Sequence, residues 1–251
     1  MSDKQKATET DSKIGYSNIG GVFVSKNIKS DFHKHHFISI HISLGEAFAF
    51  TKKGESPQLI KAIVIQKDTR YKLNSKDYSV FIHIDPYSEI GLSLTQKNNK
   101  LQELKIDLFS EVIKDINAWF TSSENEEETV ENILRCVSKE AVNKNPEKRI
   151  IDQRIKQSML LIKDSENDKI SIKEIASSVN LSTSHFARLF KKETGIAFRK
   201  FVLHQKLVKS LMAMKENNLT ESSFVGGFSD QAHFTRTFKH SFGIKPSRSK
   251  K

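Results

Sequence analysis

One segment of twelve residues occurs twice near the C-terminal end of this chain, and it constrains the fold more than any other feature. HFARLFKKETGI at 185–196 and HFTRTFKHSFGI at 233–244 agree at seven positions, 48 residues apart. In both copies two Phe lie four residues apart, which puts them on one face of a helix. A Gly follows at the point where a helix commonly ends. The repeat therefore predicts two copies of one amphipathic helix.

The residues before the first copy predict another helix packed beside it. Ser171 and Glu174 match the Ser-x-x-Glu pattern of a capping box at a helix start. Asn180-Leu181-Ser182 then predicts a tight turn, in which Ser182 caps a helix from Thr183 to about Glu193. The apolar side chains of the leading helix recur at helical spacing and form one face: Ile172, Ile175, Ala176 and Val179.

A helix, a short turn and a second helix form the helix-turn-helix pattern, whose second helix enters the major groove of DNA. Arg188 is placed to make a bidentate contact with a guanine edge. The outward face of this second helix carries short or basic side chains that allow a close approach to base edges: Thr183, Ser184, Ala187, Arg188 and Lys191.

The same pattern restarts at Leu219. A turn at Gly226-Gly227-Phe228 precedes Ser229-Asp230, which is expected to cap a helix that ends at Gly243. The helical stretch 198–215 is long enough to separate the two motifs, at about 170–193 and 219–241, so that they enter successive major grooves ~34 Å apart. We call the second helix of each motif, which is expected to contact bases, its reading helix. The outward face of the second reading helix carries Gln231, Ala232, Thr235, Arg236 and Lys239.

The two motifs also contain two histidines and, in the second motif, a group of small residues. His185 and His233 each precede a Phe expected in the core, so we interpret both as packed histidines rather than ligands. Ser222, Ser223 and Gly226 stand in the second motif where the first has Ile175, Ala176 and Val179, which costs helix propensity and core burial. We expect Phe224 to turn inward in compensation. We hypothesise that the second motif is less stable and contributes less base discrimination.

Residues 150–248 resemble the DNA-binding domain of the AraC/XylS family of bacterial transcription regulators. The resemblance rests on ISIKEIASSVNLSTSHFARLFKKETGIAF and above all on GFSDQAHFTRTFK followed by FGIKPS. It implies an all-α, two-lobed domain that binds asymmetric promoter sites on double-stranded DNA. It also implies recruitment of RNA polymerase, in most cases for activation.

The charge distribution agrees with a nucleic-acid partner for one half of the chain. Residues 148–251 hold 21 Lys and Arg against 9 Asp and Glu, whereas residues 1–147 hold 20 against 21. The whole basic excess thus lies in the C-terminal part, as expected of a polyanion-binding module joined to a neutral one. We predict a flexible N-terminus at 1–14, a sensing or dimerisation domain at 15–144 and a DNA-binding domain at 148–251.

The N-terminal part predicts short strands followed by helices. Strand-like runs at 37–44, 47–50, 59–66, 71–73 and 78–85 are separated by turn formers, which favours an antiparallel barrel or sandwich. Apolar residues then recur at helical spacing over 101–120 and 130–137. The first of these helices either covers the sheet or forms a dimer seam. Strands with following helices are similar to the cupin-like domains of many family members, which implies a small-molecule effector and a homodimer.

An enzyme is the second hypothesis. His33 and His35 have the spacing of metal-binding cupins, with His83 downstream, but no carboxylate follows where such sites need one. We therefore expect no metal, no cofactor and no catalytic residue, and keep a cupin-type metalloenzyme with a basic tail as the alternative. Inward strand positions such as Ile38, Ile40, Phe48, Ile63, Val80 and Ile82 would line a ligand cavity or a filled core.

A binder of DNA without sequence preference is a third possibility, in which phosphate charge alone supplies the affinity. No apolar run approaches the ~20 residues of a membrane span, and the N-terminus lacks the apolar middle of a signal peptide. We therefore expect a cytoplasmic protein.

Overall fold

The computed structural model describes residues 12–96, 100–122, 127–141, 151–165 and 170–246. The chain divides into two compact units. The sheet unit comprises Met1–Pro146 together with Lys239–Lys251, and the helical unit comprises Glu147–Phe238. The hinge expected at 143–146 lies outside the described residues.

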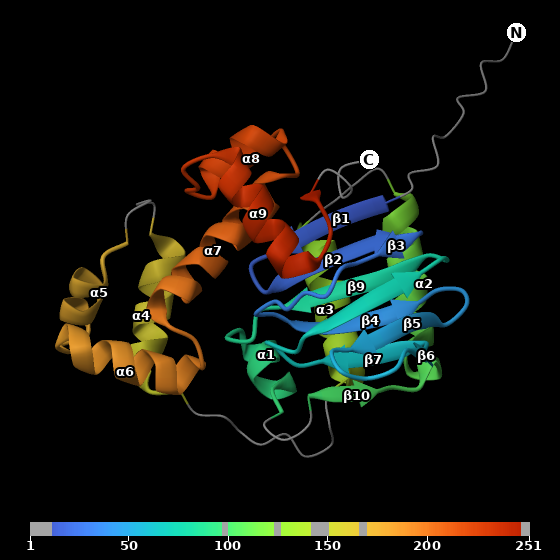
Figure 1. Ribbon diagram of the computed structural model, residues 1–251, viewed down its shortest axis with the longest axis horizontal. Helices are drawn as coiled ribbons and strands as arrows, with labels where there is room; N and C mark the ends of the chain where they lie inside the picture. Colours follow the sequence, from blue (N-terminus) through green and yellow to red (C-terminus); the bar gives the residue numbers. More distant parts are fainter. Residues whose placement is uncertain (1–11, 97–99, 123–126, 142–150, 166–169, 247–251) are drawn as a thin grey trace, which may run out of the picture. The chain divides into compact units, whose positions relative to one another are not determined.

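Two antiparallel sheets make up most of the sheet unit (Figure 1). In the described residues one sheet has the order β1-β2-β9-β4-β7-β10 and the other has the order β3-β8-β5-β6. The two sheets are separate, so the antiparallel sandwich is the form observed and the closed barrel is not. The strands are β1 (Ser12–Ser17), β2 (Gly20–Ser25), β3 (Ile28–Lys29), β4 (Ile38–Ser43), β5 (Phe48–Lys52), β6 (Gln58–Ile60), β7 (Ala62–Ile65), β8 (Tyr71–Ser75), β9 (Ser79–Ile84) and β10 (Leu101–Glu103).

Several strands differ from the sequence-based expectation. The run 59–66, expected as one strand, is divided at Lys61 into β6 and β7, which pair with β5 and β4 in different sheets. Strand β1 was not expected, and Ser12, Lys13 and Ile14 of the segment expected to be flexible begin it. The Gly pair that starts β2 is needed for close packing. A Cβ at Gly20 would lie 2.2 Å from the backbone oxygen of His83.

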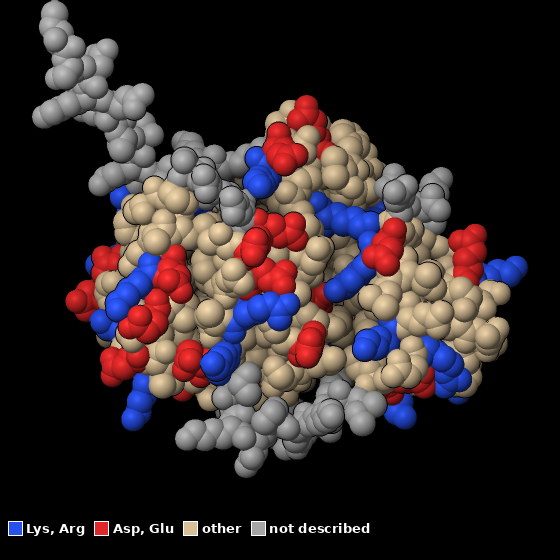
Figure 2. All heavy atoms as spheres, turned by 180° about the vertical axis from the view of Figure 1, so that it is seen from behind, with Lys and Arg blue, Asp and Glu red and all other residues tan. Residues whose placement is uncertain are grey.

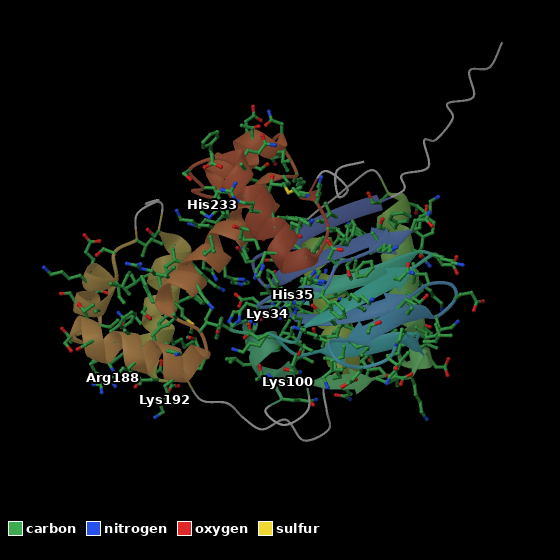
Figure 3. All side chains as sticks on the ribbon, in the orientation of Figure 1. Lys34, His35, Lys100, Arg188, Lys192 and His233 are labelled. Carbon is green, nitrogen blue, oxygen red and sulfur yellow. The ribbon has the colours of Figure 1, made fainter. Side chains whose placement is uncertain are left out.

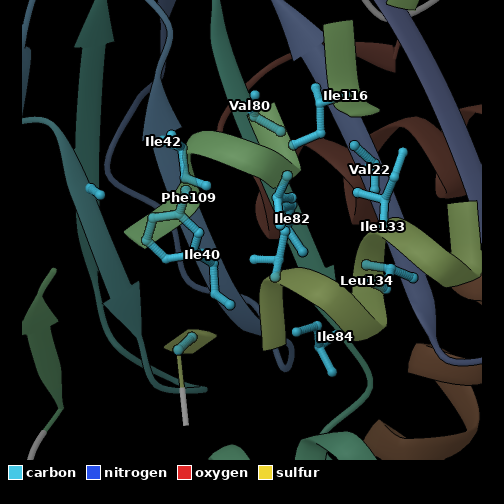
Figure 4. Packing of buried hydrophobic residues seen from close by; sticks show 14 of the residues in the cluster. Val22, Ile40, Ile42, Val80, Ile82, Ile84, Phe109, Ile116, Ile133 and Leu134 are labelled. Atoms are coloured by element: carbon cyan, nitrogen blue, oxygen red, sulfur yellow. The ribbon is translucent and has the colours of Figure 1, made fainter. Parts of the chain in front are cut away.

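Helices cover one face of the larger sheet (Figures 1 and 4). They are α2 (Ser110–Thr121) and α3 (Glu127–Ala141), preceded in the chain by α1 (Glu89–Leu94) and the 3-10 turn η1 (Ile106–Phe109). The helix expected over 101–120 is therefore wrong at its start, because Leu101–Glu103 pairs with β7 as a strand. This helix was expected either to cover the sheet or to form a dimer seam. Ile116 and Trp119 are buried in the core, which shows that it covers the sheet.

Alternation along the strands sorts two kinds of side chain onto the two faces of this sheet. Ile40 and Val22 both align with Ile82, and all three pack in the core that α2 and α3 cover. The intervening residues point to the opposite face, where His41 aligns with Phe81. Of the positions expected to line a cavity or a core, Ile38, Ile40, Val80 and Ile82 therefore belong to a filled core under the helices.

The helical unit consists of α4 (Gln153–Asp164), α5 (Ile172–Ser178), α6 (Thr183–Thr194), α7 (Phe198–Ala213), α8 (Leu219–Val225) and most of α9 (Gln231–Phe242). Phe186, Phe190 and Phe201 are fully buried, and the Phe190 ring lies 5.4 Å from that of Phe186 and 5.3 Å from that of Phe201. Around the second motif, Phe234 packs against Phe228 and Phe238. The repeated Phe pair thus forms the core of each lobe, as its spacing predicted.

Candidate nucleic-acid interface

The two predicted helix-turn-helix motifs are formed by α5 with α6 and by α8 with α9. In the first motif, the backbone N–H of Leu181 donates to Ala176 O at 2.9 Å, and Asn180 has a φ of +56°. In the second motif, the N–H of Phe228 donates to Ser223 O at 3.0 Å, and Gly227 has a φ of +79°. The same kind of hydrogen bond, preceded by a left-handed residue, closes both turns, so the repeat in sequence is a repeat in backbone structure.

The reading helices start and end as expected. The Ser182 side chain accepts from the N–H of His185, and the Asp230 carboxylate accepts from the N–H of His233 at 2.7 Å. This last hydrogen bond is also the main cause that lowers the pKa of Asp230. Gly195 ends α6 with a φ of +83°, and Gly243 follows α9 with a φ of +71°.

The leading helices differ from the expectation at their N-termini. Ser171 is the N-cap of α5, but its side chain makes no capping hydrogen bond, so the capping box predicted with Glu174 is wrong. The capping box lies instead at α8, where Asn218 Oδ1 accepts from the N–H of Glu221 at 2.9 Å and Glu221 Oε2 accepts from the N–H of Asn218 at 3.1 Å. Asn replaces Ser as the cap there, so the Ser-x-x-Glu pattern does not include this helix start.

The packing of α8 explains its serines and glycine. Ser222 and Ser223 are fully buried, and their hydroxyls donate to Asn218 O and Thr220 O within the helix, both at 2.7 Å. A Cβ at Gly226 would lie 1.9 Å from Ser210 Oγ on α7. Small residues therefore let α8 approach α7 closely. The expected inward turn of Phe224 is wrong, because close helix packing leaves no gap to fill and the Phe224 side chain is 55% exposed.

The residues predicted to read DNA lie on the outward faces of α6 and α9. Thr183, Ser184, Arg188 and Lys191 are exposed and Ala187 is half-buried on α6, whereas Ala232, Arg236 and Lys239 are exposed and Gln231 and Thr235 are half-buried on α9. Figure 3 shows Arg188 and Lys192 extending from the same side of α6, one turn apart. The second of these was not in the predicted set. Its spacing of four residues from Arg188 is the signal that could have found it.

Two histidines and one lysine of the motifs differ in their surroundings. His185 is exposed, so the expectation of a packed histidine is wrong there, because the residue before a buried Phe faces outward at this point of α6. His233 is half-buried, with its ring 5.1 Å from that of Phe228. Lys239 is grouped with the sheet unit, where its Nζ lies 3.6 Å from Asp31 Oδ2, both side chains being exposed.

The charge on the face shown in Figure 2 is mixed, with Lys and Arg interspersed among Asp and Glu. Several of the ion pairs in the chain are short-range pairs along one helix, such as Arg135 with Glu131 and Lys114 with Glu111. Exposed pairs of this kind contribute little stability. On α6, three exposed side chains are basic, namely Arg188, Lys191 and Lys192.

A cluster of histidine and tyrosine side chains occupies the sheet unit on the face of the larger sheet away from α2 and α3. His35 Nε2 lies 3.0 Å from the Tyr71 hydroxyl and 3.1 Å from Ser39 Oγ, and the His83 ring lies 5.0 Å from the His35 ring. His41 Nε2 lies 3.4 Å from the Tyr71 hydroxyl, while the buried His41 Nδ1 has no hydrogen-bond partner in the described residues. Burial lowers the pKa of His35, His41 and His83 well below the usual value, so these rings are neutral near pH 7.

The histidines do not assemble a metal centre in the described part of the chain, where no three His, Cys, Asp or Glu side chains are grouped to hold an ion. His33 and His35 instead pack ring to ring at 5.9 Å, and His33 also packs near Tyr71. The last residue of α9, Phe242, packs in the same cluster, 5.1 Å from His83 and 6.1 Å from Phe37.

The two motifs and the sandwich define a helix-turn-helix DNA-binding protein that carries an antiparallel sheet domain. A family profile described as a helix-turn-helix domain matches residues 175–251. The transcriptional regulator LumQ of Photobacterium leiognathi, described as probable, is 30% identical over 125 residues, which cover 48% of this chain and 50% of LumQ. The multiple antibiotic resistance protein MarA of Salmonella typhimurium is 30% identical over 92 residues, which cover 35% of this chain and 70% of MarA. The chain belongs to the AraC/XylS family of transcription regulators.

The likeness in fold extends over the sheet unit as well. ToxT of Vibrio cholerae O395 matches 95% of this chain and 96% of its own with a TM-score of 0.58 at 14% identity. Another ToxT structure, with unsaturated fatty acid bound, matches 95% of this chain and 94% of its own with a TM-score of 0.55 at 14% identity. These matches show a common fold, a sheet domain followed by a helical one. In the described residues, no helix has the length and apolar character needed to cross a membrane.

Proposed function

We propose that this protein activates transcription by binding a specific double-stranded DNA site through both helix-turn-helix motifs. The proposal rests on the matching backbone hydrogen bond that closes each turn. Because of it, α6 and α9 both follow their leading helices through the same kind of turn, as the DNA-contacting helix of a helix-turn-helix motif does. Residues 148–251 would be the DNA-binding domain. The predicted contacts are Thr183, Ser184, Ala187, Arg188 and Lys191 on α6, and Gln231, Ala232, Thr235, Arg236 and Lys239 on α9.

We further propose that residues 15–144 sense a small molecule, as a cupin-like domain would, and pair two copies of the chain. The fold shared with ToxT, which has been solved with unsaturated fatty acid bound, supports a fatty carboxylate as the first effector to try. RNA polymerase would be the protein partner at the promoter, and the cytoplasm the place of action. The chain spans about half the length of LumQ, so these whole-protein properties rest on the family and the fold.

Site selection from random DNA followed by footprinting tests the first proposal. The wild-type chain should enrich one sequence and protect two segments about one helical turn apart. Arg188→Ala should remove protection from one segment and Arg236→Ala from the other. Lys53→Ala is the matched control, since it removes one exposed positive charge from the turn after β5 of the sheet unit.

Equal displacement from every sequence by competitor DNA would contradict specific recognition and favour binding through phosphate charge alone. Sensing is tested separately, by adding an unsaturated fatty acid to the complex and measuring the dissociation constant for the selected site. An unchanged constant across fatty acids of several chain lengths would reject that effector class and leave DNA recognition standing.

A further inference from the structure

A hydrogen bond joins the leading helix of the second motif to the first residue of its reading helix. The Thr220 hydroxyl of α8 donates to Gln231 Oε1 of α9 at 2.7 Å, and both side chains lie at the outward side of the motif. Gln231 belongs to the face proposed to contact bases. The bond therefore involves a side chain that would read DNA, and its role in recognition depends on the proposed function.

Both ends of this bond are held by neighbouring interactions. The capping box of Asn218 and Glu221 encloses Thr220, and the Ser223 hydroxyl donates to Thr220 O. At the other end, Asp230 accepts from the N–H of His233 and so sets the start of α9. The hydroxyl is thus presented to the amide by rigid backbone on each side, which is the condition for a preorganised contact.

The first motif has no equivalent of this pair. The second residue of α5 is Lys173 and the first residue of α6 is Thr183, which occupy the places of Thr220 and Gln231. An ammonium group and a short hydroxyl cannot form the same hydroxyl-to-amide bond. The arrangement therefore distinguishes the second motif from the first.

We propose that Thr220 determines the base preference of Gln231. A free glutamine recognises adenine with two hydrogen bonds, because its Oε1 accepts from N6 and its Nε2 donates to N7. Here Oε1 is turned to α8 and engaged by Thr220, so the amide presents its NH₂ group outward. That donor matches the acceptors of guanine, O6 and N7, or O4 of thymine. The NH₂ group can still donate to N7 of adenine, but the bond that Oε1 would accept from N6 is lost, so the second motif disfavours adenine at the base pair that Gln231 contacts.

The test is site selection with the full chain carrying Thr220→Val, Thr220→Ser or no change. Valine has nearly the same shape as threonine but no hydroxyl, so Thr220→Val should leave Oε1 free to accept from adenine. The selected sequence should then shift toward adenine at one base pair of the second half-site, the DNA segment that the second motif contacts. We expect about a tenfold change in relative affinity at that pair, comparable to one bidentate contact. Thr220→Ser keeps the donor and should keep the wild-type preference. Gln231→Ala should abolish the preference at the same base pair.

The first half-site serves as the internal control and should not change in any variant. An unaltered selection profile for Thr220→Val, or a loss spread evenly over both half-sites, would overturn the proposal. Melting temperatures of Thr220→Val and the wild type should agree within a few degrees, and a large fall accompanied by uniform loss of binding would assign Thr220 a purely structural role. If the wild-type chain selects no sequence, the DNA-reading function fails first, whereas a selected site that ignores Thr220→Val rejects this inference alone.

Discussion

Replacement of Gly226 by alanine tests the close packing of α8 on α7 most directly. The added Cβ would lie 1.9 Å from Ser210 Oγ, 2.9 Å from Ser210 Cβ and 2.6 Å from the backbone oxygen of Lys206. Rotation of the Ser210 side chain relieves only the first of these contacts, so the helices must separate. Overpacking of this kind costs about 1–3 kcal/mol. For a domain of this size each kcal/mol lowers the melting temperature by about 4–8 °C.

The chain contains its own probe for separating the two units. Its one Trp, Trp119, is buried in the core of the sheet unit, whereas circular dichroism at 222 nm is dominated by the helical unit, which holds most of the helical residues described. Gly226→Ala should lower the dichroism transition and leave the Trp119 fluorescence transition in place. A second substitution, Ser210→Ala, removes the hydroxyl and should restore part of the loss, because the contact with Lys206 remains. Ser177→Ala, at an exposed position of α5, is the control, and its free energy of unfolding should stay within about 0.5 kcal/mol of the wild type.

Close packing of α8 on α7 is refuted if Gly226→Ala melts like the wild type, or if Trp119 fluorescence shifts as much as the dichroism signal. Additive effects of Gly226→Ala and Ser210→Ala would also contradict it, because residues in contact should show a coupling energy.

Three further predictions concern the sheet unit and the reading helices. Burial lowers the pKa of His33 to about 4, so the folded state disfavours the protonated ring. The resulting stabilisation is fully present above the unfolded pKa near 6.5 and is lost as pH falls from about 6.5 to 4. Unfolding followed by Trp119 fluorescence should show this loss of stability, and a stability that does not change over this pH range would contradict it. Arg188→Ala should weaken binding to the selected site more than Arg236→Ala, by about 1–3 kcal/mol in the stronger case, and a reversed order in a gel-shift titration would reject the weaker role of the second motif. Phe242→Ala removes a half-buried ring from the histidine cluster. It should destabilise the sheet unit by less than the roughly 3–5 kcal/mol that loss of a fully buried Phe costs. The shift of the Trp119 transition in urea measures this loss, and Phe32→Ala, at an exposed ring, is the control.

Most of what the sequence by itself determined about function came from the repeated segment. The spacing of Phe186 and Phe190, and of Phe234 and Phe238, predicted a buried pair in each reading helix, and all four side chains are buried. Periodicity of this kind is a local property, since residues four apart share a helix face whatever lies around them. The same holds for the caps of α6 and α9 and for Gly195, because the hydrogen bonds and the left-handed conformation at a helix end depend only on residues within one helical turn.

Contacts between distant segments decided the rest. Lys61 divides one apolar run because β6 and β7 find partners in different sheets, a choice made by strands far along the chain. Phe224 remains exposed because α7 and α8 meet through Ser210 and Gly226, which no periodicity in α8 reveals. Likewise, the bond between Thr220 and Gln231 depends on how two helices cross. Helical and strand periods are encoded residue by residue, whereas pairing, helix crossing and the orientation of a single amide arise only when the chain has folded.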